Sequence, residues 1–140
     1  MSLFLSLLLA QAAGAATTPQ RIPVDEMLEI PPSEEVAEEI VVIGRELEKW
    51  KGGVYKQDGE LRCRIKTSSG DEDVDAIRCG AMLRCFAPEV ETMDRIAAMG
   101  IPRKERSEMM QAHAESLKPC LDAAHQAGMR FLAERRVGAK

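Results

Sequence analysis

Aromatic residues are scarce in this sequence of 140 residues, which contains one Trp, one Tyr and three Phe. Aromatic side chains supply much of the buried area in a typical core, so a domain built from this chain has a thin one. One domain is expected at this length. Such a core needs further stabilisation, and the four cysteines can supply it as two disulfides.

Motifs for catalysis and metal binding are also missing. The sequence has no C-x-x-C pair, no G-x-S-x-G motif and no glycine-rich phosphate loop. His113 and His125 are too far apart on one helix to share a metal ion. The carboxylates of residues 71–75 suit a helix N-terminus better than a catalytic pair. We therefore expect no catalytic residue, no metal, no cofactor and no enzymatic activity.

The first sixteen residues contain no charged side chain. An apolar run from Leu3 to Ala10 leads into small residues that end at Ala16, which is the pattern of a signal peptide and its cleavage site. The run is shorter than the ~20 apolar residues of a membrane-spanning helix. The sequence thus predicts a signal peptide over residues 1–16, cleaved after Ala15 or Ala16. The mature protein is then periplasmic or secreted and has no transmembrane anchor.

Residues 17–39 contain four prolines and seven of the acidic residues. Residues 17–48 carry nine acids and two bases, a net charge of −7, whereas residues 49–140 carry fourteen acids and seventeen bases, a net charge of +3. This composition predicts a disordered acidic linker over 17–39, followed by a single, weakly basic domain over 40–137.

The segment from Ile40 to Ile43 permits two interpretations. Four β-branched residues in succession favour a strand, which we expect here and which another protein could pair with by β-augmentation. Apolar residues also recur at intervals of four and three, as on a helix, although Gly44 would weaken that helix by about 1 kcal/mol. The two sets are Ile40, Val41, Val42 and Ile43 for the strand, and Val36, Ile40, Ile43, Leu47 and Trp50 for the helix.

A β-hairpin is predicted around Asp58-Gly59, because both residue types accept positive φ. Closing the hairpin there pairs Val54 with Cys63 and Gly52 with Ile65. The strand after the turn alternates apolar and basic residues, which is typical of a strand with one buried face. The buried face is expected to hold Trp50, Gly52, Val54, Leu61, Cys63 and Ile65.

The opposite face of this hairpin is basic, and its side chains are Lys49, Lys51, Tyr55, Arg62, Arg64 and Lys66. Such a face can bind an acidic protein or lipid head groups, or it can be a solvated face whose charges discourage aggregation. The acidic residues from Glu34 to Glu39 are a candidate partner within the chain. Nucleic acid is not an expected partner, because the net charge is −4.

Helices are predicted over the rest of the chain. Ser69 and Glu72 have the spacing of a capping box before a helix from about Glu72 to Cys85. A second helix is expected over 88–99, and a third from Pro102, interrupted at Pro119. On the third, a common apolar face is expected for Met110, Ala114, Leu117, Leu121, Ala124, Gly128 and Phe131. The fold class is therefore α+β, a small hairpin packed on three or four helices and stabilised by disulfides.

The cysteine pairing follows from these elements. Cys79 and Cys85 lie six residues apart on one helix, about 9 Å along its axis, which is too far for a disulfide. A helix that folds back over the strand places Cys79 opposite Cys63, since each lies ~10–13 Å from the intervening turn. We therefore predict the disulfides Cys63–Cys79 and Cys85–Cys120.

The run from Leu61 to Cys79, LRCRIKTSSGDEDVDAIRC, resembles the first part of a TonB-type C-terminal domain. That family has a strand, a Ser-Ser-Gly turn and a helix, and some members place one cysteine before the turn and one in the helix. The resemblance covers about residues 50–87. It implies a Gram-negative envelope protein, but the family's later strands are not evident here. The hexapeptide from Glu39 to Gly44 is similar to the leading segment of many TonB-dependent receptors.

These observations favour an exported, non-enzymatic accessory or binding protein of the cell envelope, which is TonB-related if the resemblance reflects descent. Its partner would be an envelope protein bound by β-augmentation or on the basic hairpin face. One alternative is a structural or stress-related envelope protein without a stable partner. Another is a small hydrolase or enzyme inhibitor, for which no nucleophile or reactive loop is found.

Overall fold

The computed structural model describes residues 30–140, so the predicted signal peptide and residues 17–29 of the predicted linker lie outside the described residues. The described part has an antiparallel hairpin and several helices, which confirms the α+β class. In chain order the elements are α2 (Glu34–Lys49), β1 (Lys51–Gln57), β2 (Glu60–Thr67), α3 (Glu72–Phe86), the 3-10 turn η1 (Ala87–Glu89), α4 (Val90–Ala97), α5 (Arg103–Ser116) and α6 (Lys118–Gly138).

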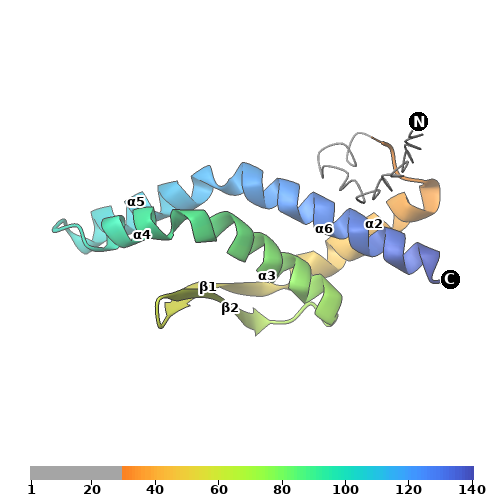
Figure 1. The fold of residues 1–140 in the computed structure, drawn as a ribbon, viewed down its shortest axis with the longest axis horizontal. Helices are drawn as coiled ribbons and strands as arrows, with labels where there is room; N and C mark the ends of the chain where they lie inside the picture. The colour runs from red at the N-terminus through yellow and green to blue at the C-terminus, as the bar shows by residue number, and fades with distance from the viewer. Residues whose placement is uncertain (1–29) are drawn as a thin grey trace, which may run out of the picture.

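The helices form a long antiparallel pair of arms (Figure 1). One arm is α3, η1 and α4, and the returning arm is α5 and α6, which the chain enters through the loop at residues 98–102. At the base of this pair α2 packs against α6 and α3, and the hairpin packs against α3. The break between α5 and α6 falls where Pro119 predicted an interruption, since Pro119 sits in the first turn of α6.

The hydrophobic core lies where α2, α3 and α6 meet. Ile43 and Val74 are fully buried in it, and Leu47, Leu132 and Ala133 surround them. The core is small and aliphatic, as the scarcity of aromatic residues predicted.

The prediction of a strand over Ile40–Ile43 is wrong, because these residues lie inside α2. Ser33 caps the helix through a hydrogen bond from the Val36 N–H to its hydroxyl (3.3 Å). The helical apolar face buries Ile43 against α6, while Val41 and Val42 are 54% and 44% exposed. Packing of that face outweighs both the β-propensity of the run and the cost of Gly44.

Two further corrections follow from α2. The folded domain begins at Glu34, so residues 34–39 belong to it and not to a disordered linker. Ile40, Val41, Val42 and Ile43 have their backbone groups engaged in the helix, so they are not available for β-augmentation.

The hairpin has the predicted register, with Gly52 opposite Ile65 and Val54 opposite Cys63. Asp58 and Gly59 have φ values of 53° and 79°, which confirms the two-residue turn. The expected buried face is only partly buried: Trp50 is buried, Gly52, Val54, Leu61 and Cys63 are half-buried, and Ile65 is 44% exposed.

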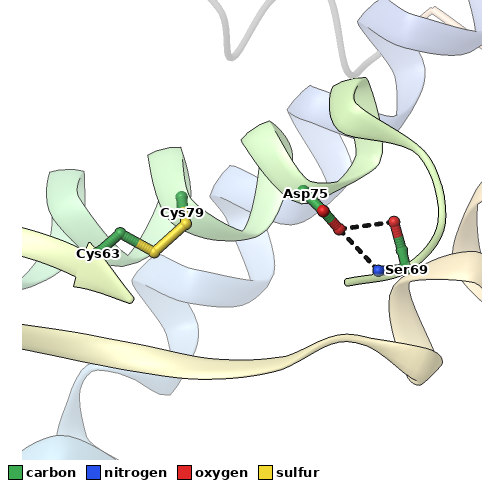
Figure 2. The surroundings of a disulfide bond; sticks show 4 residues. All are labelled: Cys63, Ser69, Asp75 and Cys79. Carbon is green, nitrogen blue, oxygen red and sulfur yellow. Dashed lines mark hydrogen bonds between the residues drawn. A yellow bond between two sulfur atoms is a disulfide. The ribbon is translucent and has the colours of Figure 1, made fainter. Parts of the chain in front are cut away.

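The first turn of α3 is capped by Asp71 and not by Ser69, which corrects the predicted capping box. The Asp71 carboxylate accepts hydrogen bonds from the N–H groups of Asp73 (2.8 Å) and Val74 (3.2 Å). Ser69 is buried and donates both its N–H (2.8 Å) and its hydroxyl (2.7 Å) to Asp75 Oδ1 (Figure 2). Ser68 donates its hydroxyl to Asp75 Oδ2 (2.6 Å), so Asp75 fixes the connection between β2 and α3.

Both predicted disulfides are present. Cys63–Cys79 joins β2 to α3, with 5.6 Å between the Cα atoms, and lies beside the Asp75 cluster in Figure 2. Cys85–Cys120 joins the end of α3 to the start of α6, with 5.9 Å between the Cα atoms. The second disulfide therefore holds the two helical arms together at the point where they leave the core.

Removing either disulfide should destabilise the protein by restoring entropy to the unfolded chain. The separations of 16 and 35 residues correspond to losses of about 3 kcal/mol for Cys63→Ala/Cys79→Ala and about 4 kcal/mol for Cys85→Ala/Cys120→Ala. Urea unfolding of the two double variants measures both values. Equal stability of wild type and either variant would contradict a structural role for that disulfide.

Loss of the Asp75 carboxylate should destabilise the β2–α3 connection. Burial raises the pKa of Asp75, but the hydrogen bonds from Ser68 and Ser69 outweigh it, so the pKa lies below the usual 3.8. The folded state therefore binds this proton less readily than the unfolded state, and the stabilisation is present above about pH 4 and is lost as the pH falls through the folded pKa.

For Asp75→Ala we expect a loss of about 1–3 kcal/mol at neutral pH, because the buried Ser69 donors lose their acceptor. We also expect a smaller decline of stability below about pH 4 than in the wild type. Glu48→Gln, which changes an exposed carboxylate on α2, is the control. If the free energy of unfolding of Asp75→Ala fell below about pH 4 as steeply as that of the wild type, Asp75 would not link pH to stability.

Candidate binding surfaces

The structure brings four of the six predicted basic-face residues together on the outer side of the hairpin. Tyr55 and Arg62 are direct cross-strand partners. The Arg64 guanidinium lies 4.5 Å from the centre of the Tyr55 ring, a cation–π arrangement. Lys66 lines the same shallow depression as Tyr55 and Arg64. This surface can present positive charge and one aromatic ring to a partner.

Lys49 and Lys51 lie at the base of the hairpin and not with this group. Lys49 ends α2, and Lys51 precedes an irregularity in the strand register. Arg62 lies 3.4 Å from the Glu60 carboxylate, which reduces the charge that it offers. Lys56 was not among the predicted residues; its ammonium group is 2.8 Å from Asp94 of α4, and this ion pair joins the hairpin to the helical arm.

The acidic residues of α2 do not pair with the basic hairpin face. Glu39 instead contacts Arg136 of α6 at 2.9 Å, and Arg136 also contacts Asp71 at 2.6 Å and Glu46 at 3.6 Å. The hydrogen bond to Glu39 raises the pKa of Arg136, and the nearby carboxylates add to this effect although burial opposes it. Arg136 therefore has a structural role, linking α2, α3 and α6.

Both histidines contact neighbouring helices. His113 Nε2 lies 3.1 Å from Glu89 Oε2, which joins α5 to η1. His125 Nε2 lies 3.4 Å from Arg78 Nη1. Burial, followed by the charge of Arg78, lowers the pKa of His125. Among residues 30–140 no group of three or more His, Cys, Asp or Glu side chains is arranged to hold a metal ion.

A largely apolar groove of about 400 Å³ lies between α3 and α6. Figure 1 shows these two helices running side by side. Small residues line both walls, Ile77 lies between them, and larger side chains from both helices stand at the rim. The small residues are Ala76, Gly80, Ala81, Ala124, Ala127 and Gly128, and the larger rim residues are Arg84, Arg130 and Phe131.

The groove is the side of the helix pair that α2 does not cover. His125 and Met129 line a different hollow with α2, and a shift of two residues turns a helix by about 200°. Ala127 and Phe131, each two residues further along, therefore face the opposite way. Phe131 is 63% exposed, whereas its neighbour Leu132 is 3% exposed. Burying such a ring is worth about 1.5–3 kcal/mol, so this surface favours a covering partner.

The rim of the groove is basic. Arg84 has no carboxylate within 4.0 Å among residues 30–140. Arg130 donates from Nε to Glu134 (2.8 Å) and from Nη1 to the carbonyl of Ile30 (2.5 Å). Arg130 is therefore already paired, and Arg84 is the arginine of the groove that can meet an added acidic group. A groove with apolar walls and one such guanidinium suits a segment that combines apolar and acidic side chains.

This site was not predicted, because a single apolar face was expected along the last helices. Ala124, Gly128 and Phe131 belong to that expected face, and they line the groove. The face in the core is instead Met129, Leu132 and Ala133. The available signal was the recurrence of small residues on both helices.

Comparison of the chain with protein-family models, curated proteins and solved structures finds no match. The similarity of residues 50–87 to a TonB-type C-terminal domain therefore stays a prediction. The strand, Ser-Ser-Gly turn and helix that it implies are present as β2, residues 68–70 and α3, and the part of the chain that the structure describes contains two strands.

The two glycines of the groove should respond differently to the same substitution. A Cβ on Gly80 meets no atom within 4 Å, so Gly80→Ala should stabilise the protein by up to about 1 kcal/mol through helix propensity. A Cβ on Gly128 would lie 2.9 Å from Ile77 Cγ2, so Gly128→Ala should destabilise the protein by about 1–3 kcal/mol. Thermal unfolding measures the stability of both variants. If the two substitutions changed stability equally, the close packing of Gly128 against Ile77 would be contradicted.

Proposed function

We propose that this chain is an exported, non-enzymatic binding protein of the cell envelope. Its binding site is the α3–α6 groove, which receives an apolar segment with acidic residues from an envelope protein. The observation that carries this proposal is the exposed Phe131 ring beside a groove of small side chains with arginines at its rim. This function replaces β-augmentation at residues 40–43, which α2 excludes.

Export is supported by two features. Residues 1–16 have the composition of a signal peptide, and all four cysteines form disulfides. Disulfides of this kind persist in oxidising compartments such as the periplasm. Within residues 30–140 no helix combines the length and apolarity needed to cross a bilayer.

The groove fits a short peptide in both size and chemistry. It extends along α3 from Ala76 to Arg84, which is about 12 Å, or two turns of a helix. Binding of a helical or extended segment in an apolar groove is a common mode of peptide recognition. Arg84, which is exposed and lines the groove, would orient an acidic side chain of such a segment.

A photoreactive phenylalanine analogue in place of Phe131 should cross-link the partner in the cells that produce the protein. The same analogue in place of Val41, an exposed residue on α2, is the matched control. We expect an adduct from position 131 that is absent at position 41. Gly80→Leu, which fills the groove where there is open space, should remove most of that adduct.

Two outcomes would contradict the proposed function. One is the absence of a specific adduct at position 131 when the protein is folded. The other is an adduct that Gly80→Leu leaves unchanged, because the partner would then bind elsewhere.

A further inference from the structure

We infer that, before a partner binds, the α3–α6 groove is covered by the same face of a second copy of this chain, in a two-fold symmetric dimer. This inference rests on the proposed binding groove, and it identifies what covers the groove and must leave when the partner arrives. The groove suits a segment with apolar and acidic side chains, and α6 carries such a segment on its own surface, at Ala127, Phe131 and Glu134.

The residues of this segment share one side of α6. Residues three and four apart lie on the same side of a helix, so Phe131 and Glu134 are in line with Ala127. Ala127 and Phe131 line the groove, and Glu134 is hydrogen-bonded to Arg130, which also lines it. The Phe131 ring is 63% exposed and the Glu134 side chain is 38% exposed. A ring and a carboxylate are therefore accessible at one end of the groove.

The alignment of α3 with α6 shows what lies at the other end. The helices are antiparallel, because Cys85 is bonded to Cys120 and a Cβ on Gly128 would lie 2.9 Å from Ile77 Cγ2. Both pairs give the same alignment. In it, Arg84 is level with the α6 position six residues before 127.

A rotation by a half-turn about an axis through the groove at Ala127 brings the opposite ends of two such faces together. Phe131 lies four residues from Ala127, about 6 Å along the helix. Its ring therefore reaches a point between the levels of Gly80 and Arg84 of the second copy. Glu134 lies seven residues from Ala127, about 10 Å on one side, and Arg84 lies about 9 Å on the other. The rotation thus places Glu134 of each copy beside Arg84 of the other.

The groove has room for the ring at that point. A Cβ on Gly80 would meet no atom within 4 Å, and Ala124 lines the opposite wall. A protruding ring and a hollow of small residues on one face make that face complementary to itself. This is the requirement for a two-fold symmetric interface, in which each copy uses the same surface.

The charges favour this antiparallel dimer. Arg84 has no carboxylate within 4.0 Å among residues 30–140, and in the dimer it meets Glu134 of the second copy. The two Arg84 side chains then lie about 18 Å apart along the groove, farther than the ~8 Å over which physiological salt screens charges. A parallel arrangement would bring both guanidinium groups to the same level.

The size of the face predicts a transient dimer. α3 is about 22 Å long, and two adjacent helices are about 20 Å wide. Two such faces together bury about 900 Å², which is below the range of about 1,200–2,000 Å² for stable interfaces. The dimer therefore dissociates readily enough for a partner to reach the groove. The partner's apparent affinity is reduced by the fraction of molecules that are dimeric.

Sedimentation equilibrium of the purified protein tests the dimer. We expect a mass between those of monomer and dimer that decreases on tenfold dilution. Arg84→Glu places a carboxylate opposite Glu134 and should raise the dissociation constant about tenfold or more. Arg103→Glu, the same change of charge at the start of α5, is the control and should leave it unchanged. A monomer at every concentration up to about 1 mM, or equal dissociation constants for the two variants, would overturn the inference.

The photoreactive analogue at position 131 identifies the face that is used. In an equal mixture of unlabelled and isotope-labelled purified protein, we expect covalent dimers that combine both labels. The cross-links should join position 131 to residues 80–84 of the other copy, and the analogue at position 41 should give none. Covalent dimers linked elsewhere, or the absence of mixed-label dimers, would also overturn the inference.

Comparison of the purified protein with the producing cells separates this inference from the proposed function. A covalent dimer in the purified protein and an adduct with a different protein in cells support both. An adduct with a different protein in cells, when the purified protein is monomeric, supports the proposed function and contradicts the dimer. A covalent dimer as the sole adduct in both settings supports the dimer and contradicts the proposed function.

Discussion

The packing of α2 against one side of the α3–α6 pair is the interaction on which the rest of the structure depends. It creates the core, because Ile43 and Leu47 of α2 lie against Leu132 and Ala133 of α6. It also determines what stays uncovered, because one short helix can cover only one side of the pair. The groove on the other side is therefore the part of the α3–α6 pair that α2 leaves uncovered.

Covalent and polar links compensate for that small core. The Cys85–Cys120 disulfide joins the helical arms where they extend beyond the core, and Cys63–Cys79 fixes the hairpin to α3. Asp75 and Arg136 add hydrogen-bonded links between elements distant in sequence. These links allow the molecule to keep an exposed aromatic ring at Phe131 without losing a defined fold.

Local signals predicted much of this fold. Asp58-Gly59 specified the hairpin and its register, and the spacing of the cysteines along a strand and a helix was enough to determine their pairing. At residues 40–43 the strand was preferred over the helical alternative, because the β-branched run has a local preference that packing of the helix against α6 reverses. The groove was missed because periodicity marks apolar positions but does not show which side of a helix finds a partner.

The environment of the Phe131 ring tests this interpretation most directly. In the uniformly labelled protein, nuclear Overhauser effects from the ring protons of Phe131 report every proton group nearby. We predict cross-peaks to the side chains of neighbouring α3 and α6 residues and none to the side chains of α2. Cross-peaks from the ring to α2 side chains would contradict the packing of α2 on the other side of the helix pair.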